Sequence, residues 1–350
     1  MSGGVNILAS GMVTAVGLDR AASCAAMRGN IDGFQETEFL SGADEFLIGA
    51  PVPLPRRWIG ERRLAHLAAG AIVDALDGHW HELGRLLLVL CLPEPERPGR
   101  VVQDSEAFAA QVREFSGLAP NTKTYVAEHG RPSGFVALDR VRAAFAEDTF
   151  DHALIVGTDS LLTSQAVTHY KAQKRLLTAD NPNGFMPGEA AAAVLCASGE
   201  PTHFALSGLG LSSEKAKIYN GLDKDGADLP LRGDGLTVAY KRALDGAQTT
   251  LGEVIYRMSD LIGEAYFFKQ TALARLRLTR DSTGFQDLWS PTETLGNIGA
   301  AVVPLMIGWA LEAFEKGYAT GSPVLIEASG DNGACGAAVF HSAAKVRRAA

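Results

Sequence analysis

The sequence contains few cysteines and none that are paired. Cys24, Cys91, Cys196 and Cys335 are scattered along 350 residues, and none forms a CxxC pair or lies at metal-ligand spacing from a histidine. This pattern excludes a disulfide framework and a structural zinc site, and it is typical of a reducing compartment. The glycine-rich fragments also lack the strand, turn, helix and acidic residue of a dinucleotide site. We therefore expect neither a metal nor a cofactor.

Long hydrophobic runs and basic stripes are also missing. The most apolar stretches cover residues 86–92 and 299–314, which are shorter than the roughly 20 residues of a membrane span. The first residues lack the basic and apolar regions of a signal peptide. The net charge of -8, spread along the chain, argues against nucleic acid as a partner. These absences predict a cytoplasmic protein.

Short apolar runs alternate with amphipathic helical patterns through most of the chain. The runs include "RLLLVLCL", "DHALIVG" and "PVLIEAS", and the helical patterns include "ERRLAHLAAGAIVDAL" and "GFVALDRVRAAFA". This alternation predicts an α/β protein with mainly parallel sheets, in which the apolar strands are covered on both faces.

The chain divides near residue 200 into two parts of similar organisation. Residues 1–200 and 201–350 each contain strands and helices, and each closes with a glycine- and alanine-rich turn that leads into an apolar strand. These closing segments read "NGFMPGEAAAAVL" and "GDNGACGAAVF". The pattern predicts an internal duplication of structure, with one half on either side of residue 200.

One turn in the first half has the form of a nucleophile-bearing turn. The extended run "TYVAE" (124–128) breaks at "HGRPSG" (129–134), and the helical pattern "FVALDRVRAAF" follows. A strand, a sharp turn and a helix place a reactive side chain at a helix N-terminus, where the helix dipole favours an anion. This turn, however, contains Ser133 and no cysteine.

Five segments, in order, together resemble the β-ketoacyl synthases, the condensing enzymes of the thiolase-like superfamily. They begin with "VNILASGMVTAVG" and "DHALIVGTDSLL", continue with "NPNGFMPGEAAAAVL" and "SPTETLGNIGAAVVPLM", and end with "EASGDNGACGAAVF". The third is the most specific match. The resemblance covers nearly the whole chain and implies a thiolase-like fold with a duplicated five-layered α-β-α-β-α core.

The positions that carry condensing chemistry in that family have changed in this sequence. The resemblance implies a cysteine nucleophile and two histidines, or a histidine and an asparagine, which together form an acyl-enzyme and assist decarboxylation. Arg131 or Pro132 occupies the cysteine position, Tyr256 or Arg257 the first histidine position, and Glu293 the second. None of these residues can replace the family's groups, so the sequence resembles a catalytically degenerate condensing enzyme.

Two residues near the turn offer an alternative chemistry. Ser133 is a candidate nucleophile with His129 as its base, although serine at a helix N-terminus more commonly caps the helix. Gly134, Glu189, Asp331 and Cys335 are expected to lie at the pocket, Glu189 as a support for its loops and Cys335 as a packed thiol. An acidic cluster of Glu264, Glu293 and Asp331 that binds a cation is a further alternative.

The first functional hypothesis is a non-catalytic partner or adaptor protein of the ketosynthase type. The second is an acyltransferase or thioesterase that acts on acyl-carrier-protein or CoA thioesters through Ser133 and His129. A divergent 3-oxoacyl-acyl-carrier-protein synthase is the third. The resemblance also implies a homodimer through the strand at Thr124–Glu128 and an acyl carrier protein or another protein as partner.

Overall fold

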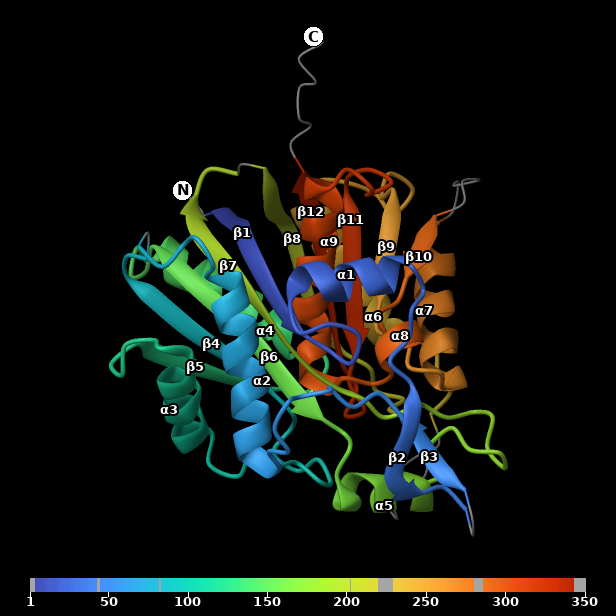
Figure 1. The fold of residues 1–350 in the computed structure, drawn as a ribbon. Helices are drawn as coiled ribbons and strands as arrows, with labels where there is room; N and C mark the ends of the chain where they lie inside the picture. The colour runs from blue at the N-terminus through green and yellow to red at the C-terminus, as the bar shows by residue number, and fades with distance from the viewer. Residues whose placement is uncertain are drawn as a thin grey trace.

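The computed structural model describes residues 4–42, 45–81, 83–201, 203–219, 229–279 and 286–342 (Figure 1). The first half contains, in order, β1 (Gly4–Val13), α1 (Arg20–Arg28), β2 (Gln35–Leu40), β3 (Phe46–Gly49), α2 (Gly60–Ala75), β4 (Leu86–Leu92), α3 (Ser105–Ser116), β5 (Lys123–Glu128), α4 (Ser133–Ala146), β6 (His152–Ser160), α5 (Ser164–Ala172) and β7 (Glu189–Gly199). The second half contains β8 (Phe204–Ser213), α6 (Asp234–Gly246), β9 (Tyr256–Ser259), α7 (Ala265–Leu278), β10 (Asp287–Trp289), α8 (Thr292–Leu295), a 3-10 turn (Gly299–Ala301), α9 (Val302–Glu315), β11 (Val324–Ser329) and β12 (Ala334–Ser342).

The main sheet repeats one strand arrangement in the two halves. Its strand order is β10-β9-β11-β12-β8-β1-β7-β6-β4-β5. In the second half, β10, β9 and β11 are parallel, and β12 and β8 follow, each antiparallel to the strand before it. In the first half, β5, β4 and β6 are parallel, and β7 and β1 follow in the same way. The halves meet where β1 and β8 pair antiparallel at Val5–Leu206 and Asn6–Ala205. The change from the first half to the second falls between β7 and β8, close to residue 200.

Helices form three layers around the two halves of the sheet. Helices α2 and α3 pack against each other, and α2 packs on β1, β6 and β7 of the first half; α6 packs on β8 and β12 of the second half and against α7. Helices α4 and α9 contact strands of both halves, so they form the layer between them (Figure 1). This arrangement confirms the five-layered α/β fold of the thiolase-like type.

Helix α9 owes its central place to its composition. Every residue from Val302 to Ala313 is buried, which is the pattern of a helix enclosed on all sides rather than of a surface helix with one apolar stripe. Helix α4 approaches it at Gly134, where a Cβ atom would lie 2.6 Å from the side chain of Val303. Only glycine permits this contact between the two central helices.

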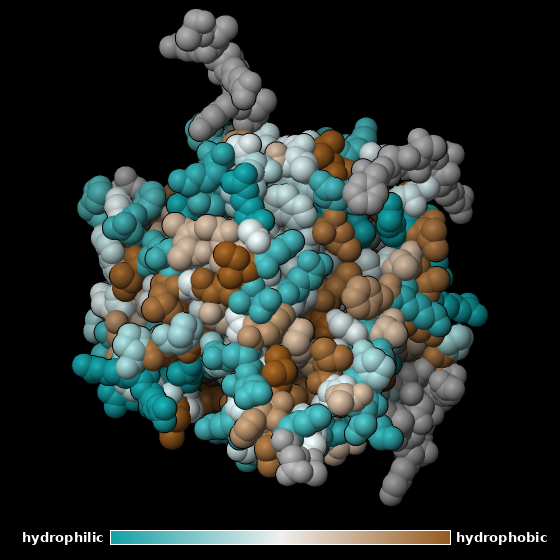
Figure 2. Space-filling view, turned by 45° about the vertical axis from the view of Figure 1, so that its right-hand side comes forward, coloured by the Kyte–Doolittle hydropathy of each residue, from teal (hydrophilic) through white to brown (hydrophobic). Residues whose placement is uncertain are grey.

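The strands and the surface follow the sequence patterns. Strand β4 is buried along nearly its whole length, as expected for an inner strand covered by helices on both faces. On the face in Figure 2, hydrophobic side chains lie in small groups among hydrophilic ones, which is ordinary for a protein surface. Across the described ranges, no helix combines the length and the apolar character that crossing a membrane requires.

Candidate functional site

The candidate site is the turn between β5 and α4. Strand β5 ends at Glu128, Gly130 adopts a positive φ of 62°, and α4 begins at Ser133. The N–H of Gly130 donates to the carbonyl of Leu92 at 3.0 Å and so attaches the turn to the end of β4. A Cβ on Gly130 would lie 2.3 Å from the carboxylate of Glu94. The predicted strand-turn-helix geometry is therefore present, and a glycine makes the tight turn possible.

Arg131 follows Gly130 in this turn, and its side chain is buried. Its side chain is 6% exposed, and its guanidinium forms ion pairs with Asp260 at 3.0 Å and with Asp331 at 3.2 Å. The guanidinium also lies 4.1 Å from the ring centre of Phe267, a cation–π distance. The turn thus directs a paired cation, rather than a nucleophile, into the protein.

Arg175 reaches the same place from the segment after α5. It binds both carboxylate oxygens of Glu264 at 2.7 Å, and it donates to Asp331 at 2.6 and 3.1 Å. It also donates to the hydroxyl of Tyr219 at 2.6 Å. Asp331 accepts from both Arg131 and Arg175, so it joins the two arginines into one buried network.

A second ion pair lies beside the network, and its arginine, Arg97, lines the same cavity as Arg131. Arg97 binds both carboxylate oxygens of Asp159 at 2.6 and 2.8 Å, and Asp159 also accepts from the backbone N–H of Ala300 at 3.0 Å. This pair links the loop after β4 to the 3-10 turn that precedes α9. Such bidentate arginine–carboxylate pairs have strong directional geometry.

Little space remains between these groups. The cavity that Glu94, Arg97, Gly130, Arg131, Leu161, Tyr170, Asn297, Gly299 and Asp331 line has a volume of about 20 Å³. A single buried water needs roughly 10–15 Å³ on this measure, whereas sites for drug-sized ligands span about 300–1,000 Å³. The cavity has room for about one water molecule and none for an acyl chain.

The carboxylates of the network differ in how burial and the arginines act on them. Burial tends to raise the pKa of Asp331, but Arg175 and Arg131 outweigh it, so that this pKa is lowered. Burial raises the pKa of Asp260 to about 6 despite the attraction of Arg131. The pKa of Glu264 is likewise raised by burial, against the effect of Arg175. Asp331 is therefore the carboxylate that the two arginines hold most firmly in its ionised form.

Ser133 is fully buried, and its hydroxyl is engaged with the main chain. Its Oγ donates to the carbonyl of Leu92 at 3.1 Å and accepts from the backbone N–H of His129 at 2.9 Å. Ser133 is the first residue of α4, and Pro132 stands at the N-cap position. The expectation that Ser133 caps the helix is therefore wrong. Its hydroxyl instead fastens the turn to β4, and it contacts the backbone of His129 rather than its ring.

Neither Tyr256 nor Arg257, the residues predicted at the first histidine position, contacts the β5–α4 turn. Arg257 points to the outer layer, where it contacts Tyr240 at 3.1 Å and Glu327 at 3.4 Å, and Tyr256 packs on Trp289 at a ring-centre distance of 4.8 Å. The residue of this segment that reaches the turn is Asp260, just past the end of β9. Strand β9 is short, so the residue that contacts the turn comes directly after it.

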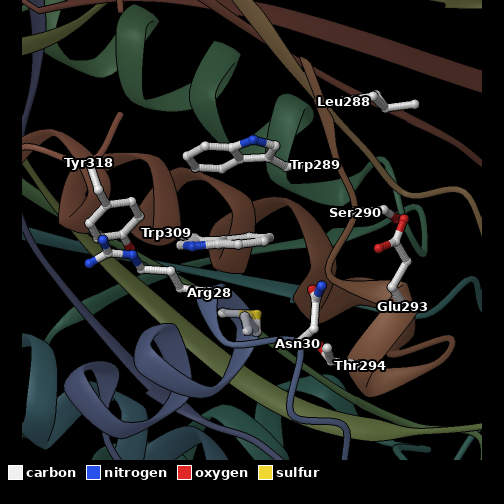
Figure 3. A pocket seen from close by; sticks show the side chains of 10 residues that line it. Arg28, Asn30, Leu288, Trp289, Ser290, Glu293, Thr294, Trp309 and Tyr318 are labelled. Atoms are coloured by element: carbon white, nitrogen blue, oxygen red, sulfur yellow. The ribbon is translucent and has the colours of Figure 1, made fainter. Parts of the chain in front are cut away.

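Glu293 also lies elsewhere. It lines a separate cavity with Trp289 and Trp309 (Figure 3), while Asn297 and Gly299 line the cavity at the turn. The alternative acidic cluster is therefore wrong: Glu264 and Asp331 both bind Arg175, and Glu293 does not join them. Among the residues that the structure describes, no group of three or more His, Cys, Asp or Glu side chains could hold a metal ion.

The other residues expected at the pocket have structural contacts. Glu189 forms an ion pair with Arg63 and accepts from the N–H of Val52 at 2.8 Å. Cys335 is 1% exposed, and burial raises its pKa to about 12, which keeps the thiol protonated and unreactive. Gly134 lies against α9. Of the four residues, Asp331 alone lines the small cavity.

Sequence reasoning missed Arg97, Asp159, Arg175 and Asp260. Arg175 follows a short helix and Asp260 a short strand, and neither belongs to a recognisable motif. The available signal was the apolar setting of several charged residues, because buried charges must find partners. Which charges pair with which depends on contacts between segments far apart in the chain.

Comparison with known proteins supports the fold. No protein-family model and no curated protein matches the sequence. Among solved structures, the chain is similar to the ishigamide ketosynthase/chain length factor, at 20% identity and a TM-score of 0.71, over 97% of this chain and 100% of the other. It is also similar to the ketosynthase ApeO in complex with its chain length factor ApeC from Xenorhabdus doucetiae, at 14% identity and a TM-score of 0.73, over 97% and 98%.

A third similar structure contains a carrier protein. In it, the type II polyketide acyl-carrier protein AntF is in complex with its ketosynthase AntDE, which bears a hexaketide; the match has 14% identity and a TM-score of 0.77, over 98% of this chain and 100% of the other. These likenesses show that the chain has the thiolase-like fold of ketosynthases and chain length factors. At such identities they establish the fold alone.

Proposed function

We propose that this protein is a non-catalytic member of a ketosynthase-type assembly, a partner subunit in the manner of a chain length factor. The observation that carries the proposal is the network at the β5–α4 turn, where Arg131 and Arg175 converge on Asp331 and leave a cavity of about 20 Å³. A condensing enzyme needs at this place a nucleophile, an oxyanion hole and space for an acyl chain.

The chemistry of the network opposes each of these requirements. Arg131 carries no nucleophilic atom at neutral pH because its guanidinium stays protonated. Pro132 has no backbone N–H to offer to an oxyanion. Asp260 and Asp331 already bind the guanidinium of Arg131, so this cation is not free to bind a malonyl carboxylate.

An assembly role needs a surface for a partner, and β5 offers one. In the main sheet β5 pairs with β4 on one side and lies at the sheet edge on the other. An edge strand presents unpaired backbone groups, which can bind a strand of a second chain. We propose that this edge joins the protein to a second copy or to an active ketosynthase, and that the assembly receives acyl groups on a carrier protein.

The catalytic part of the proposal is tested by a condensation assay. The protein is mixed with an acyl thioester and malonyl-acyl-carrier-protein, and β-ketoacyl product is measured by mass spectrometry. We expect no product above a control without protein. Protein-dependent product that disappears in Ser133→Ala would overturn the proposal and favour acyl chemistry through Ser133.

The assembly part is tested separately by native mass spectrometry. Tyr125 lies in β5 and is 36% exposed, so Tyr125→Asp places a charge on the proposed strand pair. Trp80→Asp is the matched control, because Trp80 is a comparably exposed aromatic residue outside β5. We expect a dimer for the wild type and Trp80→Asp, and dissociation for Tyr125→Asp. A wild-type monomer that also binds no ketosynthase would contradict this part of the proposal.

A further inference from the structure

Strands β2 and β3 form a two-stranded ribbon that is separate from the main sheet and lies beside α5 (Figure 1). Its inner face packs on the body of the protein, where Leu47 of β3 belongs to one hydrophobic cluster with Leu161 and with Val167 of α5. Successive residues of a strand point to opposite faces. The outer face therefore carries the alternate residues, all of them exposed: Glu36, Glu38 and Leu40 of β2 and Phe46 and Ile48 of β3.

Strand β3 is apolar on both of its faces. The inward Leu47 is 1% exposed, whereas the outward Phe46 and Ile48 are 50% and 39% exposed. A strand with one solvated face ordinarily alternates apolar and polar residues, and a strand without polar residues is typical of one that is covered on both sides. Leu40, which is 48% exposed, pairs with Phe46 across the ribbon, so the apolar outer positions adjoin one another. Such an exposed apolar group is suited to contact with a partner.

The other outer positions of the ribbon carry negative charge. Glu36 and Glu38 precede Leu40 on β2, and the exposed Glu45 directly precedes β3. None of these three carboxylates forms an ion pair within the described part of the chain. Lys171 of α5 reaches the ribbon, but its Nζ donates to the backbone carbonyl of Leu40 at 3.2 Å. An apolar surface bordered by unpaired carboxylates is complementary to apolar side chains that are flanked by lysine or arginine.

This charge decides between the surfaces that could cover the ribbon. In a symmetric dimer the same face of two copies meets itself, which would bring the carboxylates of Glu36 and Glu38 against their own copies. An anionic membrane surface would repel the same carboxylates. A protein segment with basic and apolar side chains meets neither obstacle.

We propose that the outer face of the β2–β3 ribbon binds a segment of another protein in which basic side chains flank apolar ones. The apolar side chains pack on Leu40, Phe46 and Ile48, and the lysine or arginine side chains pair with Glu36 and Glu38. Neither the β5–α4 turn nor the edge of β5 takes part, so the proposal does not depend on the function proposed above.

The test is fluorescence anisotropy with two labelled heptapeptides, KTVTITK and ETVTITE. In an extended conformation, each peptide presents its two charged residues, its valine and its isoleucine on one face. We expect saturable binding of KTVTITK with a dissociation constant below about 1 mM. Binding of ETVTITE should be much weaker, because its glutamates would face Glu36 and Glu38. Added salt should weaken the binding of KTVTITK, since exposed charges are screened.

Two substitutions in the ribbon test each part of the contact. Phe46→Ser should weaken binding of KTVTITK about tenfold through the loss of an aromatic contact. Glu38→Lys should weaken it roughly threefold to tenfold, because it replaces an attraction by a repulsion. The matched controls are Phe268→Ser, at a phenylalanine that is 48% exposed on α7, and Glu147→Lys, at an exposed glutamate directly after α4. Both controls should bind the peptide as the wild type does.

Several results would overturn the proposal. They are the absence of saturable KTVTITK binding at millimolar concentration, equal binding of the two peptides, and unchanged binding by Phe46→Ser and Glu38→Lys. A wild-type oligomer that Phe46→Ser dissociates and Tyr125→Asp does not would show that a second copy covers the ribbon instead. Sedimentation with phosphatidylserine vesicles that Phe46→Ser abolishes would assign the face to a membrane. Thermal unfolding should be nearly unchanged in both ribbon variants, because the two side chains are exposed.

Discussion

The segments that follow β5 and β10 occupy equivalent places in the two halves, yet they differ in what surrounds them. Both edge strands lead toward a central helix, α4 in the first half and α9 in the second. Arginines and carboxylates fill the space at the first turn, leaving about 20 Å³, whereas aromatic rings line about 360 Å³ beside the second. The two halves thus share a strand arrangement but differ in the volume and the lining of the cavity at these places.

The arrangement of helices and strands therefore does not determine which side chains line each site. The glycines and apolar strands that hold α4 and α9 in place are present in both halves, while the polar side chains at each site are free to change. In the first half they form a stabilising contact between segments far apart in the chain. Four substitutions test how far this contrast extends.

The largest effect is expected at Arg175. Arg175→Leu leaves Glu264 and Asp331 without their main partner in a buried place. Removing one member of a buried ion pair typically costs about 3–5 kcal/mol, so the free energy of unfolding should fall by roughly that amount. Urea denaturation measures it. Arg142→Leu, which removes an exposed pair with Asp139, should cost no more than about 0.5 kcal/mol; equal losses would contradict the structural role of the network.

The next effect is expected where the two central helices touch. Gly134→Ala forces a Cβ to within 2.6 Å of Val303, and overpacking of this kind costs about 1–3 kcal/mol. Val303→Ala should relieve part of that cost, so the double variant should be more stable than the sum of the single changes predicts. Strict additivity in a double-mutant cycle would show that α4 and α9 do not meet at this point.

Asp260 should make stability depend on pH. Its folded pKa of about 6 lies above the unfolded value, so the native state binds more protons between about pH 4 and 6. Its contribution to stability therefore falls as pH rises through this range, while Asp331, whose pKa is lowered, acts at lower pH. Relative to Asp260→Asn, the wild type should lose about 1–2 kcal/mol between about pH 4 and 7. A difference between the two proteins that stays constant over this pH range would argue against a raised pKa of Asp260.

The smallest effect is expected in the larger cavity, which Trp309 lines. Trp309→Phe removes an indole N–H that has no partner in the described part of the chain and keeps an aromatic ring. The lost ring area and the removed unsatisfied donor act in opposite directions, so we expect the free energy of unfolding to change by less than about 1 kcal/mol. A loss as large as that of Arg175→Leu, measured by the same urea denaturation, would show that Trp309 contributes as much to stability as the ion-pair network does.

The fold could be predicted from the sequence because its determinants are local. Apolar runs such as 86–92 and the turn at Gly130 can be recognised within a few residues. The absence of a cysteine at residues 131–133 could also be read directly. What replaced it could not, because Arg175, Asp260 and Asp331 come from separate segments whose side chains meet only in the folded protein. Which charged side chains form ion pairs depends on how distant segments pack, and a single sequence does not show that packing.

The central claim is that the β5–α4 turn takes up no acyl group. Intact-protein mass spectrometry after incubation with acyl-CoA and acyl-carrier-protein donors tests it most directly. We predict the unmodified mass for the wild type, since Ser133 is fully buried and hydrogen-bonded to the main chain and Cys335 is a buried, protonated thiol. A stoichiometric acyl adduct that disappears in Ser133→Ala and persists in Cys335→Ala would contradict the claim.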